Sequence, residues 1–167
     1  MNKYLVICIL FGSIFSCKKI SQEGAIVDLM INLTIESSDG KDLLNPNTPN
    51  AIKAGDINIF YEINGKRETY LSTSNAYKLD NPAGFTVNKP DNSFGNKYFL
   101  TIFSNPDVNN NSITVIAVSG REEIKIISEV TQTSNSHSIA KIWYKNNLVW
   151  PIAGNDGPKY VQTTLAQ

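Results

Sequence analysis

The sequence predicts an all-β protein, folded as a single antiparallel β-sandwich of about eight strands. Apolar and polar residues alternate through several short segments, which is the period of a strand with one buried face. Turn-forming pairs such as Asn64-Gly65 and Ser119-Gly120 separate these segments. No segment beyond residue 19 shows helical periodicity. The three observations together favour two packed sheets.

The first predicted strand covers residues 27–36. Its alternate positions are apolar, and Met30 is the one apolar residue on the polar side. We therefore expect one face of this strand to be buried and the other to be solvated. The apolar positions are Val27, Leu29, Ile31, Leu33 and Ile35.

A loop is predicted for residues 37–50, which are rich in Asp, Asn, Gly and Pro. Its side-chain oxygens are candidate calcium ligands, although their spacing does not match an EF-hand, which needs ligands at fixed alternate positions and a distal Glu. The candidates are Asp39, Asp42, Asn45 and Asn47. The alternative, which we prefer, is that these side chains form ordinary Asx-turns.

A β-hairpin follows, with strands at 56–63 and 66–72 around Asn64-Gly65. Asn and Gly supply the two positive-φ positions of a type I′ turn. A turn of two residues places Glu62 opposite Arg67, as a solvated cross-strand ion pair, and by the same register Ile59 opposite Tyr70 in the core.

The middle of the chain is less regular. Residues 75–96 contain scattered Pro and Gly, which predicts a crossing loop with one short strand near Phe85–Val87. Residues 97–103 are apolar on both faces, as expected of a central strand.

Two further strands are predicted at 112–118 and 121–129, joined by Ser119-Gly120. A two-residue turn there places Ile113 opposite Ile126 on a buried face. The last predicted strand, at 159–165, completes an immunoglobulin-like or transthyretin-like sandwich.

A third hairpin supplies the candidate binding residues. Strands at 138–145 and 148–152 around Asn146-Asn147 place Trp143 directly opposite Trp150. Two adjacent indoles form a flat platform of the kind that stacks on sugar rings, so Trp143, Trp150 and the neighbouring Tyr144 are candidate ligand-binding residues. The alternative, which we weigh more heavily, is that these aromatic residues pack in the core or at a sheet edge.

The N-terminus predicts export and lipid anchoring. After Lys3 the chain is apolar or small up to Ser16, as in a secretory signal. Ile14-Phe15-Ser16-Cys17 resembles the bacterial lipobox, which implies cleavage before Cys17 and its acylation; a plain secretory signal is the alternative. We expect a signal peptide at 1–16, a lipidated tether at 17–25 and a β-sandwich domain at 26–167, held in a membrane by its acyl chains.

A family resemblance extends this interpretation. The lipobox, the segment Asp42–Pro49 leading into 56–61, and the late segment Lys141–Trp150 resemble small uncharacterised lipoproteins of Bacteroidetes-type bacteria. The resemblance implies attachment to the outer membrane and a sandwich fold, and carries no catalytic residue across. Lys18-Lys19 departs from the acidic residues that direct such lipoproteins to the cell surface, which leaves the side of the membrane open.

Composition argues against several classes of function. Fifteen basic and fifteen acidic residues cancel, so no nucleic-acid surface is indicated. His137 is the single histidine, expected in an exposed loop, and the mature chain has no free thiol, so zinc ligation by several imidazoles or thiolates is not expected. Neighbours in a strand face opposite ways, so Glu122 and Glu123 cannot act as a facing acid and base. We expect neither an enzyme nor a cofactor.

Two functional hypotheses remain. The first is a membrane-anchored binding or adhesion module for glycan or protein ligands, motivated by the lipid anchor and the tryptophans. The second is a structural or accessory subunit of an envelope complex, which would use an edge strand to pair with another chain.

Overall fold

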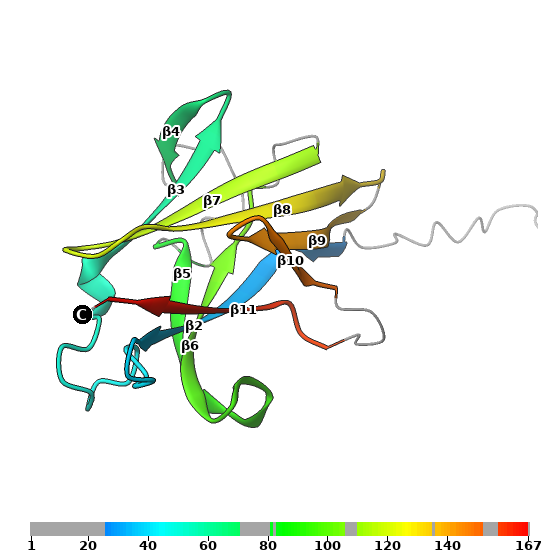
Figure 1. Cartoon of the computed structure of the whole chain (residues 1–167). Coiled ribbons are helices and arrows are strands. Elements are labelled where there is room, and N and C mark those ends of the chain that lie inside the picture. Colours follow the sequence, from blue (N-terminus) through cyan, green and yellow to red (C-terminus); the bar gives the residue numbers. More distant parts are fainter. Residues whose placement is uncertain are drawn as a thin grey trace, which may run out of the picture.

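The computed structural model of the chain describes residues 26–70, 81, 83–105, 110–134, 136–151 and 157–166 (Figure 1). The expected signal peptide, Cys17 and the tether lie outside these residues. No helix in the described part of the chain is long and apolar enough to cross a membrane.

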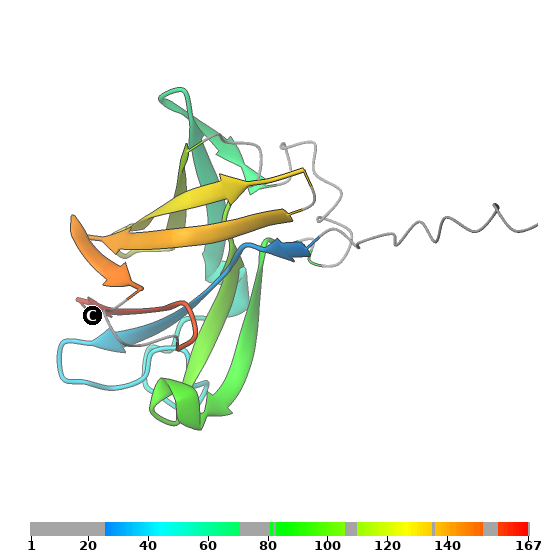
Figure 2. The ribbon, with the colours of Figure 1, turned by 90° about the vertical axis from the view of Figure 1, so that its right-hand side faces the viewer.

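The strands form two sheets that pack as a β-sandwich (Figures 1 and 2). The larger sheet has the order β1 (Ile26–Asp28), β9 (Ser136–Tyr144), β8 (Ile124–Gln132), β7 (Asn110–Val118), β3 (Ile57–Ile63) and β4 (Lys66–Thr69), and β10 (Asn147–Trp150) also pairs with β9. The smaller sheet has the order β11 (Tyr160–Leu165), β2 (Met30–Ser37), β6 (Lys97–Phe103) and β5 (Phe85–Asp91). Two short 3₁₀ turns, η1 (Ala54–Asp56) and η4 (Asn92–Phe94), complete the described elements. The predicted all-β sandwich is confirmed, with eleven described strands rather than about eight.

Both ends of the described chain are held by parallel pairing. β1 runs parallel to β9, and after Leu29 the chain continues as β2 in the other sheet, parallel to β11. The sandwich is antiparallel in its other strand pairings, as predicted, and these two parallel pairings were not expected. Parallel neighbours are distant in sequence and are not joined by a hairpin turn. Alternation within each segment therefore does not indicate that two strands pair in parallel.

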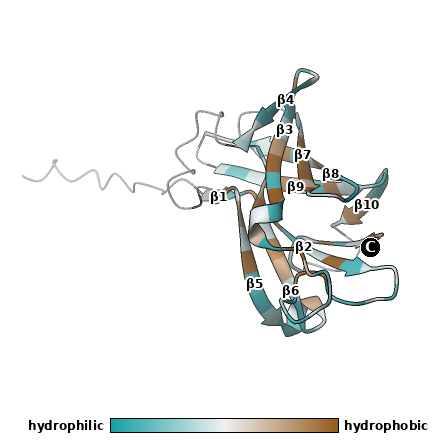
Figure 3. Cartoon of the chain, turned by 90° about the vertical axis from the view of Figure 1, so that its left-hand side faces the viewer, coloured by the Kyte–Doolittle hydropathy of each residue, from teal (hydrophilic) through white to brown (hydrophobic). Residues whose placement is uncertain are grey.

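The core lies between the sheets. Ile31, Leu33 and Ile35 of β2 are completely buried, which confirms the predicted apolar face. Ile126 and Ile142 face them from the larger sheet, within the same hydrophobic cluster. Burying each such side chain is worth about 1.5–3 kcal/mol, so these residues dominate the stability of the fold. Figure 3 shows hydrophobic residues along β3 and β6, whereas β4 at the sheet edge is hydrophilic.

The hairpin formed by β3 and β4 has the predicted turn and register. Asn64 and Gly65 have φ values of 52° and 74°, and Glu62 lies opposite Arg67. The two side chains nevertheless bind other partners: Arg67 binds Glu123 and Glu62 binds Lys125. The predicted cross-strand ion pair was wrong because both side chains reach past their opposite neighbour to charges at the start of β8.

The register of β7 and β8 differs from the prediction by one residue. Ile116 lies opposite Ile124 and Thr114 opposite Ile126, so Ile113 faces outward. The strands are joined by residues 119–123 rather than by two residues, and a slip of one residue exchanges the faces. Because β7 carries apolar residues on both faces, its pattern could not exclude the wrong register.

The observed register of β7 and β8 places a threonine in the core, and this leads to a stability prediction. Thr114 is completely buried, and its Oγ1 has no hydrogen-bond partner in the part of the chain that the structure describes. We expect Thr114→Val to raise the free energy of unfolding by about 1 kcal/mol, because it removes an unsatisfied buried hydroxyl while keeping the shape. Urea denaturation measures the change.

Thr34 supplies the matched control. It is buried to the same extent, but its Oγ1 hydrogen-bonds to the Tyr160 hydroxyl at 2.7 Å. Thr34→Val should therefore lower the free energy of unfolding by about 1 kcal/mol. Equal losses in both variants would contradict the assignment of Thr114 as unsatisfied.

Candidate functional site

The outer face of the larger sheet carries a line of apolar side chains. Cross-strand register sets four residues side by side on β10, β9, β8 and β7, and we call them the apolar row: Leu148, Trp143, Ile127 and Ile113. Successive side chains of a strand point to opposite faces of the sheet. The core-facing residues next to these four point inward, so the four side chains lie on the outer surface of the sandwich. Leu148 is 50% exposed and the other three are half-buried.

A hollow of about 410 Å³ lies beside Trp143. The segment before β8 and the turn between β9 and β10 form its rim. We call it the Trp143 hollow, and its lining is Glu122, Glu123, Lys125, Ile127, Trp143, Tyr144, Lys145 and Asn146. Two aromatic residues, one isoleucine and several polar groups therefore line one depression, which is the composition expected of a small ligand site.

Two charges at the hollow are neutralised within the protein. Arg67 donates two hydrogen bonds to Glu123, Nη1 to Oε1 and Nη2 to Oε2, both at 2.8 Å. The Arg67 guanidinium holds the pKa of Glu123 below its ordinary value, and Glu123 in turn raises the pKa of Arg67. Lys125 pairs with Glu62 at 2.6 Å. These partly exposed ion pairs leave no net charge on those groups.

Other polar groups at the hollow remain available. Within the described ranges, no hydrogen bond or ion pair engages the side chains of Glu122, Lys145 or Asn146. The Lys145 ammonium lies 5.4 Å from the ring centroid of Tyr144. The indole N–H of Trp143 likewise donates to no described residue, and Lys141 Nζ lies 5.9 Å from its ring centroid. A ligand with hydroxyl groups could accept from and donate to these side chains.

The two tryptophans are not opposite each other, so the predicted pairing was wrong. Positive φ values fall on Lys145 and Asn146, which shifts the turn by one residue and puts Leu148 opposite Trp143. A register shift between Leu148 and Trp150 then sets Trp150 opposite Ile142. Lysine rarely adopts positive φ, so the sequence favoured the Asn-Asn pair as the turn.

Trp150 and Tyr144 serve the packing of the sandwich. Trp150 packs against the core, and its indole N–H donates to the Gly157 carbonyl at 3.1 Å. The Tyr144 ring also packs against the core, and its hydroxyl hydrogen-bonds to Thr163 on β11, which links the two sheets. Of the three candidate ligand-binding residues, Trp143 alone lies on the outer face.

The candidate calcium ligands are engaged in local bonds. Asp39 accepts from Ser37 and pairs with Lys41, whose hydrogen bond lowers the pKa of Asp39. The other acceptors form turns and a loop contact: Asp42 accepts from the backbone N–H groups of Leu44 and Tyr98, and Asn45 from that of Asn47. This is the Asx-turn alternative. In the described residues, no group of three or more His, Cys, Asp or Glu side chains is placed to hold a metal ion.

His137 lies in β9 rather than in an exposed loop. It pairs with Val27 of β1 and with Gln132 of β8, and the residue is half-buried. Its Nδ1 is buried with no hydrogen-bond partner among the residues described. The expectation was wrong because the polar neighbours of His137 resemble a loop, whereas the strand begins at Ser136.

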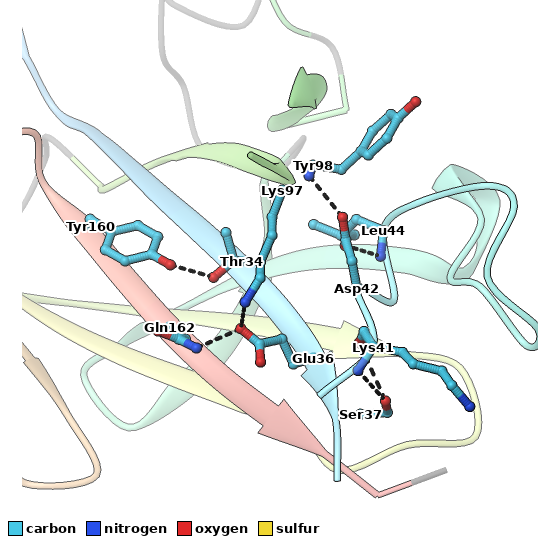
Figure 4. Close-up of polar contacts among 10 residues, drawn as sticks. All are labelled: Thr34, Glu36, Ser37, Lys41, Asp42, Leu44, Lys97, Tyr98, Tyr160 and Gln162. Atoms are coloured by element: carbon cyan, nitrogen blue, oxygen red, sulfur yellow. Dashed lines mark hydrogen bonds and ion pairs between the residues drawn. The ribbon is translucent and has the colours of Figure 1, made fainter. Parts of the chain in front are cut away.

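Sequence reasoning missed a polar network on the smaller sheet (Figure 4). Glu36 of β2 is only 8% exposed, and its Oε1 accepts from Lys97 Nζ and Gln162 Nε2, each at 2.5 Å. The hydrogen bond with Glu36 raises the pKa of Lys97. The network joins β2, β6 and β11, so Thr34 and Glu36 are buried on the face of β2 that was expected to be solvated, whereas Met30 on that face is exposed. Since the charges of the network neutralise each other, we assign it a structural role.

Sequence reasoning also missed two adjoining apolar clefts of about 630 and 600 Å³. They share Ala54 and Val87 and lie between the start of β3 and the edge strand β5. Their apolar lining includes Ile52, Ile57, Tyr70 and Phe85. Only the position of β5 at the edge of the smaller sheet creates them, and alternation within a segment does not reveal strand order.

Comparison with known proteins adds no further evidence about the site. No family model, no curated protein and no solved structure matches this chain.

Proposed function

We propose that this protein is a non-catalytic envelope lipoprotein that binds carbohydrate at the Trp143 hollow. The observation that carries the proposal is the half-buried indole of Trp143 beside three polar side chains that have no hydrogen-bond or ion-pair partner among the described residues: Glu122, Lys145 and Asn146. A pyranose ring has an apolar C–H face and a rim of hydroxyl groups. The indole suits the face, and the carboxylate, ammonium and amide suit the rim.

The two ion pairs at the hollow support the same function. They leave Glu123 and Lys125 already paired with opposite charges, so the hollow needs no charged ligand to neutralise these two groups. The hollow is also shallow and lies on a sheet face, which gives a binding residue a rigid support. No facing pair of free carboxylates lies in it, because Glu123 is bound to Arg67.

The principal test is Trp143→Ala. We expect at least a tenfold loss of affinity for any oligosaccharide that the protein binds, or about 1.4 kcal/mol, because the stacking surface is removed. A panel of immobilised neutral and acidic oligosaccharides, followed by calorimetry with the best of them, measures the loss. Trp143→Phe should retain part of the affinity.

Met30→Ala is the control for this test. Met30 is 46% exposed on the other sheet and lines neither the Trp143 hollow nor the two clefts, so its replacement should leave affinity unchanged. A Trp143→Ala variant that folds normally and binds every oligosaccharide as the parent does would refute the proposal.

The membrane location rests on the lipobox at Ile14–Cys17. Two or three acyl chains at Cys17, at about 0.8 kcal/mol for each buried methylene, hold a domain stably in a bilayer. We expect the parent protein in the membrane fraction and Cys17→Ser in the soluble fraction. Protease accessibility of an epitope after Gln167 on intact and lysed cells then distinguishes the cell surface from the periplasm. A parent protein found only in the soluble fraction contradicts lipid anchoring.

A second function, as an accessory subunit of an envelope complex, is favoured by a separate observation. The edge strand β5 has no described neighbour on the side away from β6, and the apolar clefts lie beside it. A partner strand could add to this edge and bury side chains such as Val87. Cross-linking in membranes that recovers only monomer would count against this role.

A further inference from the structure

We infer that the carbohydrate is a neutral, linear oligosaccharide lying across the strands along the apolar row; this inference rests on the proposed function. The proposed function requires only one sugar at the Trp143 hollow. The row extends the apolar surface beyond the hollow on both sides, to Leu148 on β10 and to Ile113 on β7.

The dimensions of the row favour a chain over a single sugar. Leu148 and Ile113 are separated by three strand spacings of about 4.8 Å, or roughly 14 Å, which exceeds the width of one pyranose ring. The Trp143 hollow includes Trp143 and Ile127 but neither end of the row. One sugar stacked on Trp143 therefore leaves the aliphatic side chains at both ends to contact the units before and after it.

The row also has a defined end. On β3 the position opposite Ile113 is Glu62, a charged residue that pairs with Lys125. Covering this ion pair with an apolar sugar face would not add binding energy, because both charges would lose their contact with water. The binding surface therefore stops after β7, and we expect affinity to stop rising at about three or four sugar units.

The charges beside the row favour an uncharged ligand. Lys141 and Glu129, on one side of the row, pair at 3.0 Å, and Lys125, on the other side, pairs at 2.6 Å with Glu62 at the end of the row. The charges without an ion pair at the hollow, Glu122 and Lys145, are of opposite sign. Among the described residues beside the row, no excess positive charge is present to attract a polyanionic glycan, and its carboxylates would meet Glu122 and Glu129.

A length series tests the inference. The probes are malto- and cello-oligosaccharides of one to six units, with polygalacturonate oligomers as the anionic counterpart, titrated against the intact domain by calorimetry. We expect affinity for one of the two neutral series to rise up to the third or fourth unit and then level off. Polygalacturonate should bind more weakly at every length.

Variants at the two ends of the row locate the chain. Ile113→Thr keeps the β-branched shape and removes apolar surface, so binding of the tetraose should fall about threefold while binding of the monosaccharide is unchanged. Leu148→Gln tests the other end, where the replaced side chain is 50% exposed, so we expect the variant to fold as the parent does. Ala117→Thr is the matched control, because Ala117 lies four residues after Ile113, on the same face of β7, and pairs with Asn58 away from the row.

The outcomes separate this inference from the proposed function. If Trp143→Ala abolishes binding but affinity is independent of length and neither end variant has an effect, the linear arrangement is wrong and the Trp143 site stands. Tighter binding of polygalacturonate overturns the neutral class alone. If no oligosaccharide binds, or Trp143→Ala binds as the parent does, the proposed function fails and the inference fails with it.

Discussion

Replacing Gly84 with alanine is expected to lower the free energy of unfolding by about 3 kcal/mol. Gly84 has a φ of +77°, which an L side chain rarely adopts. A Cβ atom at this position would lie 2.7 Å from Cγ and 2.8 Å from Cδ2 of Tyr70, which is itself buried. Backbone strain and a steric clash therefore act together, and urea denaturation measures their sum.

Gly95 separates the two contributions. Its φ is +66°, but an added Cβ would meet no atom within 4 Å. Gly95→Ala should therefore cost about 1 kcal/mol, from backbone strain alone. Combining Gly84→Ala with Tyr70→Ala removes the clash, so the double variant should lose less than the sum of the single changes. Equal losses at Gly84 and Gly95 would show that the close approach to Tyr70 has no energetic weight.

The second large effect is expected at the network of Glu36. Lys97→Met removes the ammonium and leaves the carboxylate of Glu36 buried with one remaining donor, Gln162. Breaking a fully buried pair costs about 3–5 kcal/mol. Because the Lys97 side chain is 30% exposed, solvent screens part of this, and we expect a loss of about 2 kcal/mol. Chemical denaturation at neutral pH measures it.

The same pair predicts a dependence on pH. The folded pKa of Lys97 is raised above its ordinary value of 10.5, so its contribution is complete below that pH. The contribution is lost as pH rises through the folded pKa, where the ammonium loses its proton. The difference in stability between the parent and Lys97→Met should therefore shrink above about pH 10.5 and remain constant between pH 7 and 9.

Two further variants control this prediction. Glu36→Gln combined with Lys97→Met removes both charges and should recover part of the loss, because no uncompensated carboxylate remains buried. Lys41 pairs with Asp39 on the surface, with side chains 56% and 50% exposed, so Lys41→Met should change stability little. A loss at Lys41 as large as that at Lys97 would argue against burial as the cause.

Local patterns predicted the parts of the fold that depend on neighbours in sequence. The alternation around Ile31 identified the buried face of β2, and Asn64-Gly65 identified a hairpin with its register. The turn between β9 and β10 lies one residue earlier than predicted, because Lys145 adopts a positive φ. A lysine in the sequence does not indicate that conformation. That displacement determined which residue lies opposite Trp143, so Trp143 was found as a candidate but its apolar neighbours were not.

Relations between distant strands could not be predicted in this way. The burial of Glu36 depends on β6 and β11 lying beside β2, and the clefts near Val87 depend on β5 being an edge. On β7, apolar residues on both faces allowed two registers of similar quality, and the wrong one turned Ile113 inward. Three of the four residues in the apolar row therefore became visible only in the structure.

The parallel pairing of β2 with β11 has a consequence for the timing of folding. Thr34 and Tyr160, which meet in this pairing, are 126 residues apart. Bringing such distant segments together costs chain entropy before any contact is gained, and domains dominated by such pairings fold slowly. β2 gains its second neighbour in the sheet only when β11 pairs with it. A chain still being synthesised therefore presents one edge of β2 unpaired until residues 160–165 have emerged, and a chain shortened before them keeps that edge open to association.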